Sequence, residues 1–193
     1  MRGRPSTLDH GQVLEKAQRV FWEKGFAATS LDDLLTATNM GSGSFYNAFK
    51  GGKKELFSKA IQQRRQAFQA FKNKLKTSDS PIDEIKDFFR SIAKADRDTH
   101  LRGCIIANTV VEMTFLDEDL EKEAVTILKE VEAMFTAAIR QGQEQGVLRN
   151  RTEPELLGRY LITLWNGLNV SRRMYPSKKG LEELINLQLS VIS

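Results

Sequence analysis

The sequence contains little cysteine, histidine and proline. These shortages bear on disulfides, metal sites and the type of secondary structure. The one cysteine, Cys104, excludes an internal disulfide and a cysteine-rich zinc site. The two histidines, His10 and His100, lie far apart in the chain and lack the spacing of metal ligands. Only 4 prolines in 193 residues favour a mostly helical chain. We therefore expect a helical protein with no metal site.

Long apolar runs and catalytic constellations are also missing. No run approaches the roughly 18 residues needed to span a bilayer, and no signal-peptide core follows the basic start. The expected location is therefore the cytoplasm, with no membrane partner. No nucleophile–base pair emerges, and Gly41 to Ser44 lacks the Lys-Ser/Thr pair and the preceding strand of a phosphate-binding loop. The sequence thus predicts neither an enzyme nor a cofactor.

The charge that is present is unevenly distributed. Residues 1–80 contain 14 lysines and arginines against 7 aspartates and glutamates, whereas residues 81–193 contain 15 against 18. The net charge of +4 therefore combines +7 in the first part with −3 in the second. A basic first part suits contact with a polyanion such as nucleic acid.

Apolar residues recur at helical spacing along most of the chain, and no alternating strand pattern is found. The predicted fold class is all-α, with about nine helices over residues 8–24, 30–38, 42–49, 53–76, 81–98, 102–115, 117–144, 153–175 and 181–192. Thr29 or Ser30 is expected to cap the second of these helices, and Ser80 the fifth. Thr152 to Glu155 has capping-box spacing at the start of the eighth.

The second and third predicted helices are short, are joined by a tight turn at Asn39 to Gly41, and follow a supporting helix. These are the parts of a helix-turn-helix, whose second helix enters the major groove of DNA. Here that helix is Ser42 to Phe49, with Phe45 and Phe49 on its buried side. Its outer side begins with small residues, which let the backbone approach bases and phosphates closely.

Residues 9–61 resemble the DNA-binding domain of the tetracycline-repressor (TetR) family. The features that carry the resemblance are the segment Ala17 to Phe21, Gly25-Phe26, Thr29 to Leu31, Gly43 to Tyr46, Phe49, and Lys54 to Phe57. The remainder of the chain matches the family in length and helix number. The resemblance implies a helix-turn-helix domain over residues 1–54, with a basic arm over 1–7, and a helical ligand-binding and dimerisation domain over 55–193.

The resemblance also implies which residues bind DNA. Those expected to face bases or phosphates are Thr29, Ser42, Gly43, Ser44, Tyr46, Asn47 and either Lys53 or Lys54. The choice between the two lysines stays open because residues 50–52 form a stretch one residue longer than usual, and Tyr46 has the alternative of a core aromatic. Arg2 and Arg4 suit an extended arm in a narrow minor groove, or belong to a disordered basic tail.

Two further functions follow from the resemblance for the second part of the chain. The last two long helices are expected to pair between subunits in a homodimer, through Leu157, Leu161, Leu164, Leu184, Leu187 and Val191. A dimer places two recognition helices about 34 Å apart, as a palindromic operator requires.

A small-molecule site is expected in the same part, because aromatic and flexible residues gather there with a few polar groups. The candidate lining residues are Phe68, Phe71, Phe88, Phe89, Ile92, Cys104, Asn108, Thr109, Glu112, Met113, Phe115, Met134, Phe135, Trp165 and Asn169. Each aromatic has the alternative of ordinary core. Cys104 lies near a predicted helix N-terminus, where a thiol can become reactive; its alternative is a small buried residue.

Together these features predict a ligand-responsive transcriptional regulator. It would be a homodimeric repressor that a small-molecule effector releases from a palindromic operator on double-stranded DNA. The alternatives are an enzyme, a sequence-blind DNA binder that uses the basic front, and a helical ligand-binding module whose basic end meets protein partners. A sequence-blind binder would show no preference for a palindrome at physiological salt.

Overall fold

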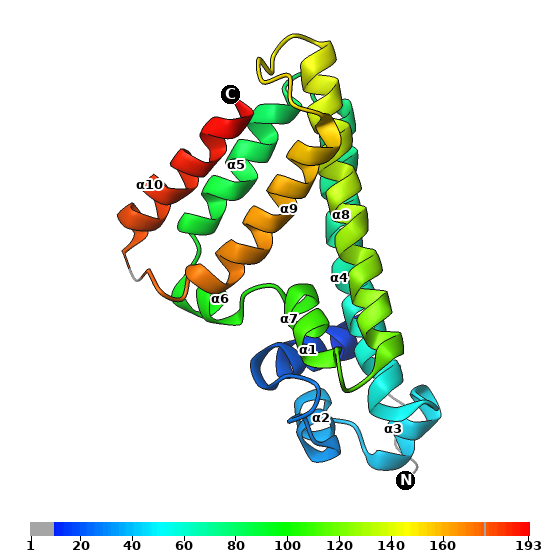
Figure 1. The fold of residues 1–193 in the computed structure, drawn as a ribbon. Coiled ribbons are helices and arrows are strands. Elements are labelled where there is room, and N and C mark those ends of the chain that lie inside the picture. The colour runs from blue at the N-terminus through cyan, green and yellow to red at the C-terminus, as the bar shows by residue number, and fades with distance from the viewer. Residues whose placement is uncertain (1–9, 176) are drawn as a thin grey trace. The chain divides into compact units, whose positions relative to one another are not determined.

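The computed structural model describes residues 10–175 and 177–193, and all regular structure in these two ranges is helical. The elements are α1 (His10–Lys24), α2 (Leu31–Thr38), α3 (Ser42–Ala48), α4 (Gly52–Thr77), α5 (Pro81–Ala93), α6 (Arg97–Arg102), α7 (Ile105–Met113), α8 (Glu118–Glu144), α9 (Pro154–Ser171), α10 (Lys178–Leu189) and the short 3-10 helix η1 (Ser190–Ile192), as Figure 1 shows. The predicted all-α fold class is confirmed.

The helices pack into two compact units. The first ends at Arg65, the second starts at Gln66, and α4 runs through both. The first unit has a core of almost fully buried side chains: Ala17, Phe21, Leu34, Phe45, Phe49, Leu56, Phe57 and Ile61. Phe21 and Phe57 meet edge to face, with ring centroids 4.9 Å apart. This core stabilises α2 and α3, which are too short to be stable helices in isolation.

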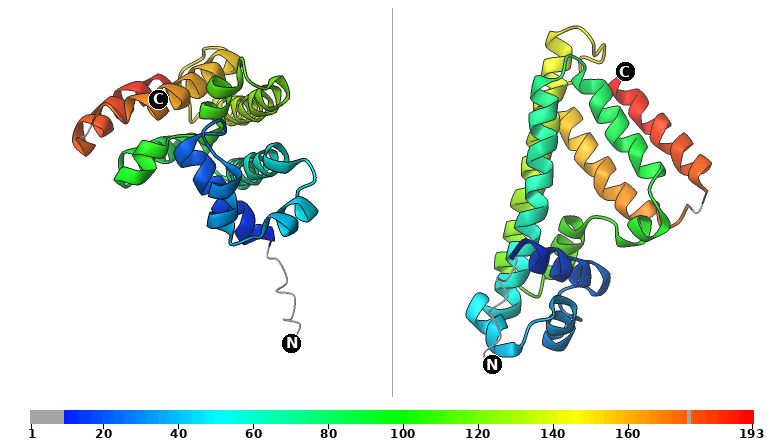
Figure 2. Two further views of the ribbon diagram at one scale, coloured as in Figure 1. Left: turned by 90° about the horizontal axis from the view of Figure 1, so that it is seen from below. Right: turned by 180° about the vertical axis from the view of Figure 1, so that it is seen from behind.

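The second unit is built around α8. This helix packs against α5, α7 and α9, while α10 packs against α5. Figures 1 and 2 show α5, α9 and α10 as neighbours on one side of α8. The most deeply buried side chains are Ile85, Phe89, Ile106, Met113, Phe135, Ile139, Leu161 and Ile185. Each contributes about 1.5–3 kcal/mol of favourable burial, so this unit has an ordinary hydrophobic core.

Two glycines allow the helices of the second unit to approach closely. A Cβ added to Gly142 of α8 would lie 2.6 Å from Cγ1 of Ile82 in α5. A Cβ added to Gly158 of α9 would lie 2.1 Å from Oγ1 of Thr136 in α8. Both distances are far shorter than a van der Waals contact, so a side chain at either position would push two helices apart.

The helix predicted over residues 81–98 is divided in the structure. α5 ends at Ala93, and Asp96 caps a separate helix, α6, by accepting a hydrogen bond from the Thr99 amide at 2.7 Å. Gly103 then ends α6 with a positive φ of 66°, a conformation that glycine adopts without strain. The next helix, α7, therefore starts at Ile105 and not at residue 102 as predicted.

Two predicted side-chain caps do not form. Ser80 occupies the N-cap position of α5, but its side chain makes no capping hydrogen bond. The predicted capping box at Thr152 to Glu155 is also wrong, since Glu153 is the N-cap of α9 and makes no side-chain cap. Both helices begin with a proline, Pro81 and Pro154, which has no amide hydrogen to satisfy and is favourable at the first helical position.

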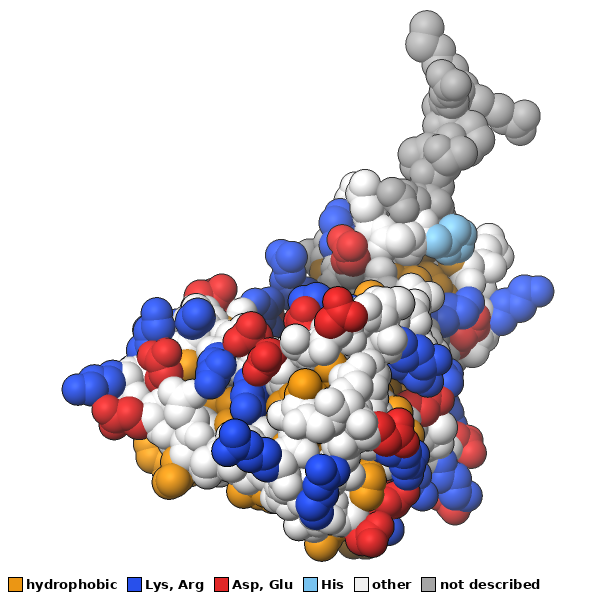
Figure 3. All heavy atoms as spheres, turned by 90° about the horizontal axis from the view of Figure 1, so that it is seen from above, with side chains coloured by type: hydrophobic (Ala, Val, Ile, Leu, Met, Phe, Trp, Pro, Cys, Tyr) orange, Lys and Arg blue, Asp and Glu red, His pale blue; other side chains and the backbone are white. Residues whose placement is uncertain are grey.

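The surface carries charges of both signs. Figure 3 shows them interspersed on one face, with hydrophobic side chains exposed between them. The most exposed large hydrophobic residues, each more than half exposed, include Val111, Phe115, Leu156, Val170, Met174 and Leu187. Exposed apolar groups of this kind mark interaction surfaces when they gather on one face. In the ranges described, no helix is both long enough and apolar enough to cross a membrane.

Candidate DNA-binding and effector sites

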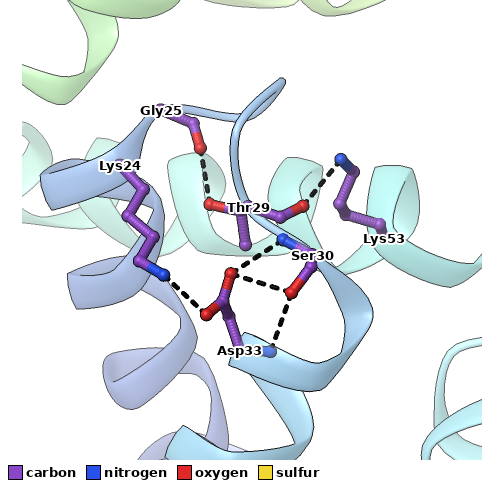
Figure 4. A network of polar contacts seen from close by, with 6 residues as sticks. All are labelled: Lys24, Gly25, Thr29, Ser30, Asp33 and Lys53. Atoms are coloured by element: carbon purple, nitrogen blue, oxygen red, sulfur yellow. Dashed lines mark hydrogen bonds and ion pairs between the residues drawn. The ribbon is translucent and has the colours of Figure 1, made fainter.

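A network of polar contacts fixes the start of α2 (Figure 4). The Ser30 hydroxyl accepts a hydrogen bond from the Asp33 amide at 3.1 Å, and the Asp33 carboxylate accepts one from the Ser30 amide at 2.9 Å. Lys24 forms an ion pair with the same carboxylate at 2.6 Å. The hydrogen bonds from Lys24 and Ser30 lower the pKa of Asp33 to about 2. Of the two predicted caps, Ser30 is therefore the one that forms.

Thr29 is buried beneath this network. Its side chain is 1% exposed, and its hydroxyl donates to the Gly25 carbonyl at 2.5 Å. A hydroxyl that is buried and already paired has no free route to a DNA phosphate. The predicted phosphate contact of Thr29 is therefore corrected: this residue joins the end of α1 to the start of α2.

The two candidate lysines at the start of α4 differ in their surroundings. Lys53 Nζ donates to the carbonyls of Phe26 and Thr29, each at 2.9 Å, and lies 4.4 Å from the centre of the Phe26 ring. Its ammonium group is thus held by the protein itself. Lys54 is exposed. The structure therefore favours Lys54 over Lys53 as a DNA-facing residue.

The turn between α2 and α3 depends on Asn39. Its φ of 56° and ψ of 39° are left-handed, and its amide hydrogen bonds back to the end of α2. Asparagine tolerates this conformation better than most residues. The tight turn leaves Gly41 extended, with a ψ of 153°, immediately before α3 begins.

Helix α3 has one buried and one exposed side. Phe45 and Phe49 are 0% and 1% exposed, and their ring centroids lie 5.5 Å apart. The predicted DNA-facing residues of this helix are all exposed: Ser42, Gly43, Ser44, Tyr46 and Asn47. Tyr46 is 52% exposed and touches Phe45 only with an edge-to-face contact, so the alternative of a core aromatic is wrong.

Gly43 stands at an open position of α3. A Cβ there would meet no atom of the described residues within 4 Å, its chain neighbours and the backbone of α3 apart, so packing in the described part of the chain does not require glycine here. An absent side chain on an exposed helix N-terminus suits close approach by an external group such as a phosphate. Arg2 and Arg4, the predicted arm residues, lie outside the described residues.

The predicted aromatic pocket residues of the second unit pack on one another. The Phe88 ring centroid lies 4.9 Å from that of Phe71, 5.1 Å from Trp165 and 6.4 Å from Phe135, and Phe89 lies 5.8 Å from Phe135. Trp165 Nε1 is buried and finds no hydrogen-bond acceptor in the described part of the chain. The structure thus brings these five rings together in one cluster. The rings pack against one another as the aromatic side chains of a hydrophobic core do.

The other predicted pocket residues divide between buried and exposed positions. Ile92, Cys104, Thr109, Met113, Met134 and Asn169 are buried, and Phe68, Asn108 and Glu112 are half-buried. Asn108 donates to the Arg102 carbonyl at 3.1 Å. Phe115 is fully exposed after α7, so its predicted place in a pocket is corrected. Cys104 is 4% exposed as the N-cap of α7, which favours its interpretation as a small buried residue.

Three of the predicted dimer residues belong to the core of the subunit. Leu157, Leu161 and Leu164 are 3%, 0% and 6% exposed, because this face of α9 packs against α8. They are therefore corrected, since a buried side chain cannot meet a partner. Leu187 of α10 is 70% exposed, and Leu184 and Val191 are half-buried. These three side chains therefore remain candidates for contact with a partner subunit.

The exposed side of α9 was missed by the sequence analysis. It presents Leu156, Tyr160, Thr163, Gly167 and Val170, which recur every three or four residues and so share one helical face. A groove of roughly 430 Å³ lined by Leu156, Tyr160, Thr163 and Val191 joins this face to the end of the chain. The leucine pair at 156 and 157 was the available signal, but periodicity alone did not decide which leucine lies inside.

Models of two protein families match the chain. Residues 13–60 match "Bacterial regulatory proteins, tetR family", and residues 81–187 match "Tetracyclin repressor-like, C-terminal domain". The second match alone covers more than half of the chain. The chain therefore belongs to the tetR family of bacterial regulatory proteins, which confirms the resemblance seen in the sequence.

Similar proteins extend over nearly the whole chain. The HTH-type transcriptional repressor DhaR of Mycobacterium sp. (strain GP1) is 26% identical over 183 residues, which cover 91% of this chain and 87% of DhaR. The HTH-type transcriptional repressor NemR of Escherichia coli (strain K12) is 25% identical over 183 residues, covering 93% of this chain and 90% of NemR.

A solved structure with the same fold contains DNA. It is a cysteine mutant of the TetR-family transcriptional regulator CifR in complex with 26-bp double-strand operator DNA. Its TM-score to this chain is 0.85 at 25% identity, with 99% of this chain and 100% of that chain covered. The chain is thus a helix-turn-helix transcriptional regulator of this family in both sequence and fold.

Proposed function

We propose that this regulator is a repressor, that its homodimer binds a palindromic operator on double-stranded DNA, and that a small molecule bound to the second unit releases it. The observation that carries the proposal is the two-sided α3. Its outer residues from Ser42 to Asn47 are exposed, apart from Phe45, which with Phe49 fixes the helix from behind. Two buried rings hold the helix in one orientation, and a fixed orientation is what base reading requires.

In this proposal α3 enters the major groove, with its positively polarised N-terminus directed at the DNA. Ser42, Ser44 and Asn47 contact base edges or nearby phosphates, Tyr46 donates its hydroxyl to a phosphate, and Lys54 contributes a charge at the backbone. The similarity to CifR, which was solved on operator DNA, supports this arrangement.

The homodimer is proposed to form through the exposed sides of α9 and α10. Leu156, Val170 and Leu187 are 57%, 63% and 70% exposed, which is costly for leucine and valine unless a partner covers them. A twofold dimer pairs the same face of both subunits and places the two α3 helices one duplex turn, about 34 Å, apart.

In this proposal the domain of residues 1–54 binds DNA. The domain of residues 55–193 binds the effector and the partner subunit. Both similar proteins described above are transcriptional repressors, which supports a regulator without catalytic activity that acts in the cytoplasm.

The first experiment is selection of bound duplexes from a random DNA pool by the purified chain at about 0.15 M salt, close to physiological conditions. We expect a palindromic motif. An Asn47→Ala variant should lose or relax the motif without loss of thermal stability, because Asn47 is exposed. Recovery of no motif, together with binding that disappears as salt rises, would instead identify a sequence-blind DNA binder.

The dimer is tested separately by light scattering. Leu187→Glu places a charge in the proposed interface and is expected to shift the protein toward monomer. Val111→Glu is the matched control, since Val111 is 80% exposed but belongs to α7, which is not part of the proposed interface. The proposed interface would be contradicted if both substitutions shifted the protein toward monomer equally, or if neither did.

A further inference from the structure

A cavity of roughly 490 Å³ lies in the second unit, outside the aromatic cluster that the sequence predicted as the effector site. It is formed where the end of α5, helix α6, the end of α9 and the start of α10 meet. A volume of this size is typical of small-molecule sites. The geometry therefore provides room for an organic ligand at a place to which no role has yet been given.

Positive charge lines this cavity. Arg97 comes from α6, Arg172 and Arg173 follow α9, and Lys178 begins α10. None of the ten lining residues is an aspartate or a glutamate. Because no carboxylate offsets the cations in the wall, the cavity favours an anion.

Arg172 differs from the other basic residues of the cavity in its burial. Its side chain is almost buried, since the residue is 6% exposed. One terminal nitrogen donates to the Thr99 carbonyl, while Nε is buried without an acceptor among the described residues. Burial lowers the pKa of the Arg172 guanidinium, which reflects the cost of removing this charge from water. A buried cation with an unused donor is stable when it has an anionic partner.

His100 adds a second unused group at the same cavity. Its Nδ1 is also buried and without a partner in the part of the chain that is described. The remaining wall is largely apolar and includes Ala93, Leu101 and Leu181. Leu101 is 53% exposed although it is a leucine, and a ligand body over it would remove apolar surface from water.

We propose that this cavity binds a small organic anion. The carboxylate or phosphate head pairs with Arg172, whose planar guanidinium suits such groups. Arg97, Arg173 and Lys178 add attraction around it, and the apolar body packs against Ala93, Leu101 and Leu181. The identification of this anion as the effector rests on the proposed function, whereas its binding does not.

Binding is measured by thermal unfolding of the purified chain without DNA, at fixed ionic strength and protein concentration. The probes are 2-naphthoate and 2-naphthyl phosphate, with 2-naphthalenemethanol as the uncharged control and inorganic phosphate as the anion without an apolar body. At about ten times Kd a bound ligand raises the unfolding temperature by about 3–6 °C. We expect such a rise with at least one aromatic anion. A rise no larger than that given by the alcohol and inorganic phosphate would overturn the proposal.

Three variants locate the site. Arg172→Met should abolish the rise. If that variant does not fold, the double variant Arg97→Gln/Lys178→Gln changes only exposed residues and should weaken binding several-fold. Lys129→Gln/Lys179→Gln is the matched control, because it also removes two positive charges, both lysines are exposed and neither lines the cavity. Equal losses in the double variant and the control would mean that the probe binds by general charge only, which contradicts the proposal.

The effector role is then measured as release of the selected operator by the same probe. Release by the bound anion in wild type, and release only at a several-fold higher anion concentration in Arg97→Gln/Lys178→Gln, is the expected result. Stabilisation by the anion in a chain that selects no operator would overturn the proposed function but leave the anion site intact. Operator binding by a chain that no anion stabilises would overturn the anion site but leave the proposed function intact.

Discussion

Gly43 in α3 and Gly158 in α9 are both helical glycines, yet they have opposite surroundings. Among residues 10–175 and 177–193, a Cβ at Gly43 would meet no atom within 4 Å beyond its chain neighbours and the backbone of its own helix, whereas a Cβ at Gly158 would lie 2.1 Å from Thr136 Oγ1. The first unit therefore leaves space at its surface, and the second unit uses the missing side chain to bring two of its own helices together. The same residue type stands at an open surface position in one unit and allows close internal packing in the other.

The largest effect is expected at the packed glycine. Gly158→Ala should lower the free energy of unfolding by about 2–3 kcal/mol because the new methyl group forces α8 and α9 apart, although alanine favours a helix by about 1 kcal/mol. Urea denaturation at one protein concentration measures the loss. Adding Thr136→Ala removes the closest atom and should restore part of the stability; no recovery would mean that the crossing of α8 and α9 is not the cause.

At the exposed glycine the expected effect is on DNA alone. Gly43→Ala should keep or slightly raise the unfolding temperature, because the methyl group meets no side chain of the described residues. Its affinity for the selected operator should fall about tenfold, or about 1.4 kcal/mol, as the backbone is held away from the DNA. Fluorescence anisotropy with labelled operator tests this. An unchanged affinity would show that α3 does not approach DNA at Gly43.

The two adjacent lysines sharpen the comparison within the first unit. Lys54→Gln should weaken operator binding and reduce the slope of log affinity against log salt by about one, because Lys54 is exposed. Lys53→Gln should instead lower stability by about 1 kcal/mol, because it removes two hydrogen bonds to carbonyls. The opposite assignment of these two effects would reverse the roles given to the lysines.

The smallest effect concerns the cap of α2. The pKa of Asp33 is lowered from 3.8 to about 2 in the folded chain, so its stabilising effect is present above the unfolded pKa and is lost as pH falls toward about 2. Asp33→Asn should therefore flatten the fall in unfolding temperature over that acidic range. Asp32→Asn, on the same turn but outside the network in Figure 4, is the control. If both variants flattened the fall in unfolding temperature equally, the cap of α2 would not be its cause.

The sequence predicted the features that depend on local spacing. The short α2 and α3 and the buried pair Phe45 and Phe49 all follow from neighbours within one or two helical turns. The predicted tight turn contains Asn39, whose left-handed φ of 56° asparagine tolerates better than most residues.

Features that depend on distant partners were not predictable in this way. Lys53 turns toward carbonyls 24 and 27 residues earlier in the chain, and no local pattern distinguishes it from Lys54. On α9, consecutive leucines at 156 and 157 make either face a plausible interior until α8 covers one of them. The cationic cavity joins residues around position 100 to others after position 171, and the only local signals were the pairs Arg172-Arg173 and Lys178-Lys179.

The continuity of α4 has a consequence for dissecting the molecule. This helix extends over 26 residues, Gly52–Thr77, and after Gly52 it contains neither proline nor glycine, so its ladder of hydrogen bonds continues through the boundary between Arg65 and Gln66. Cutting there would leave about four carbonyls without partners on one fragment and about four amides on the other. Fragments that are meant to fold separately should therefore share the residues of α4 and not divide them.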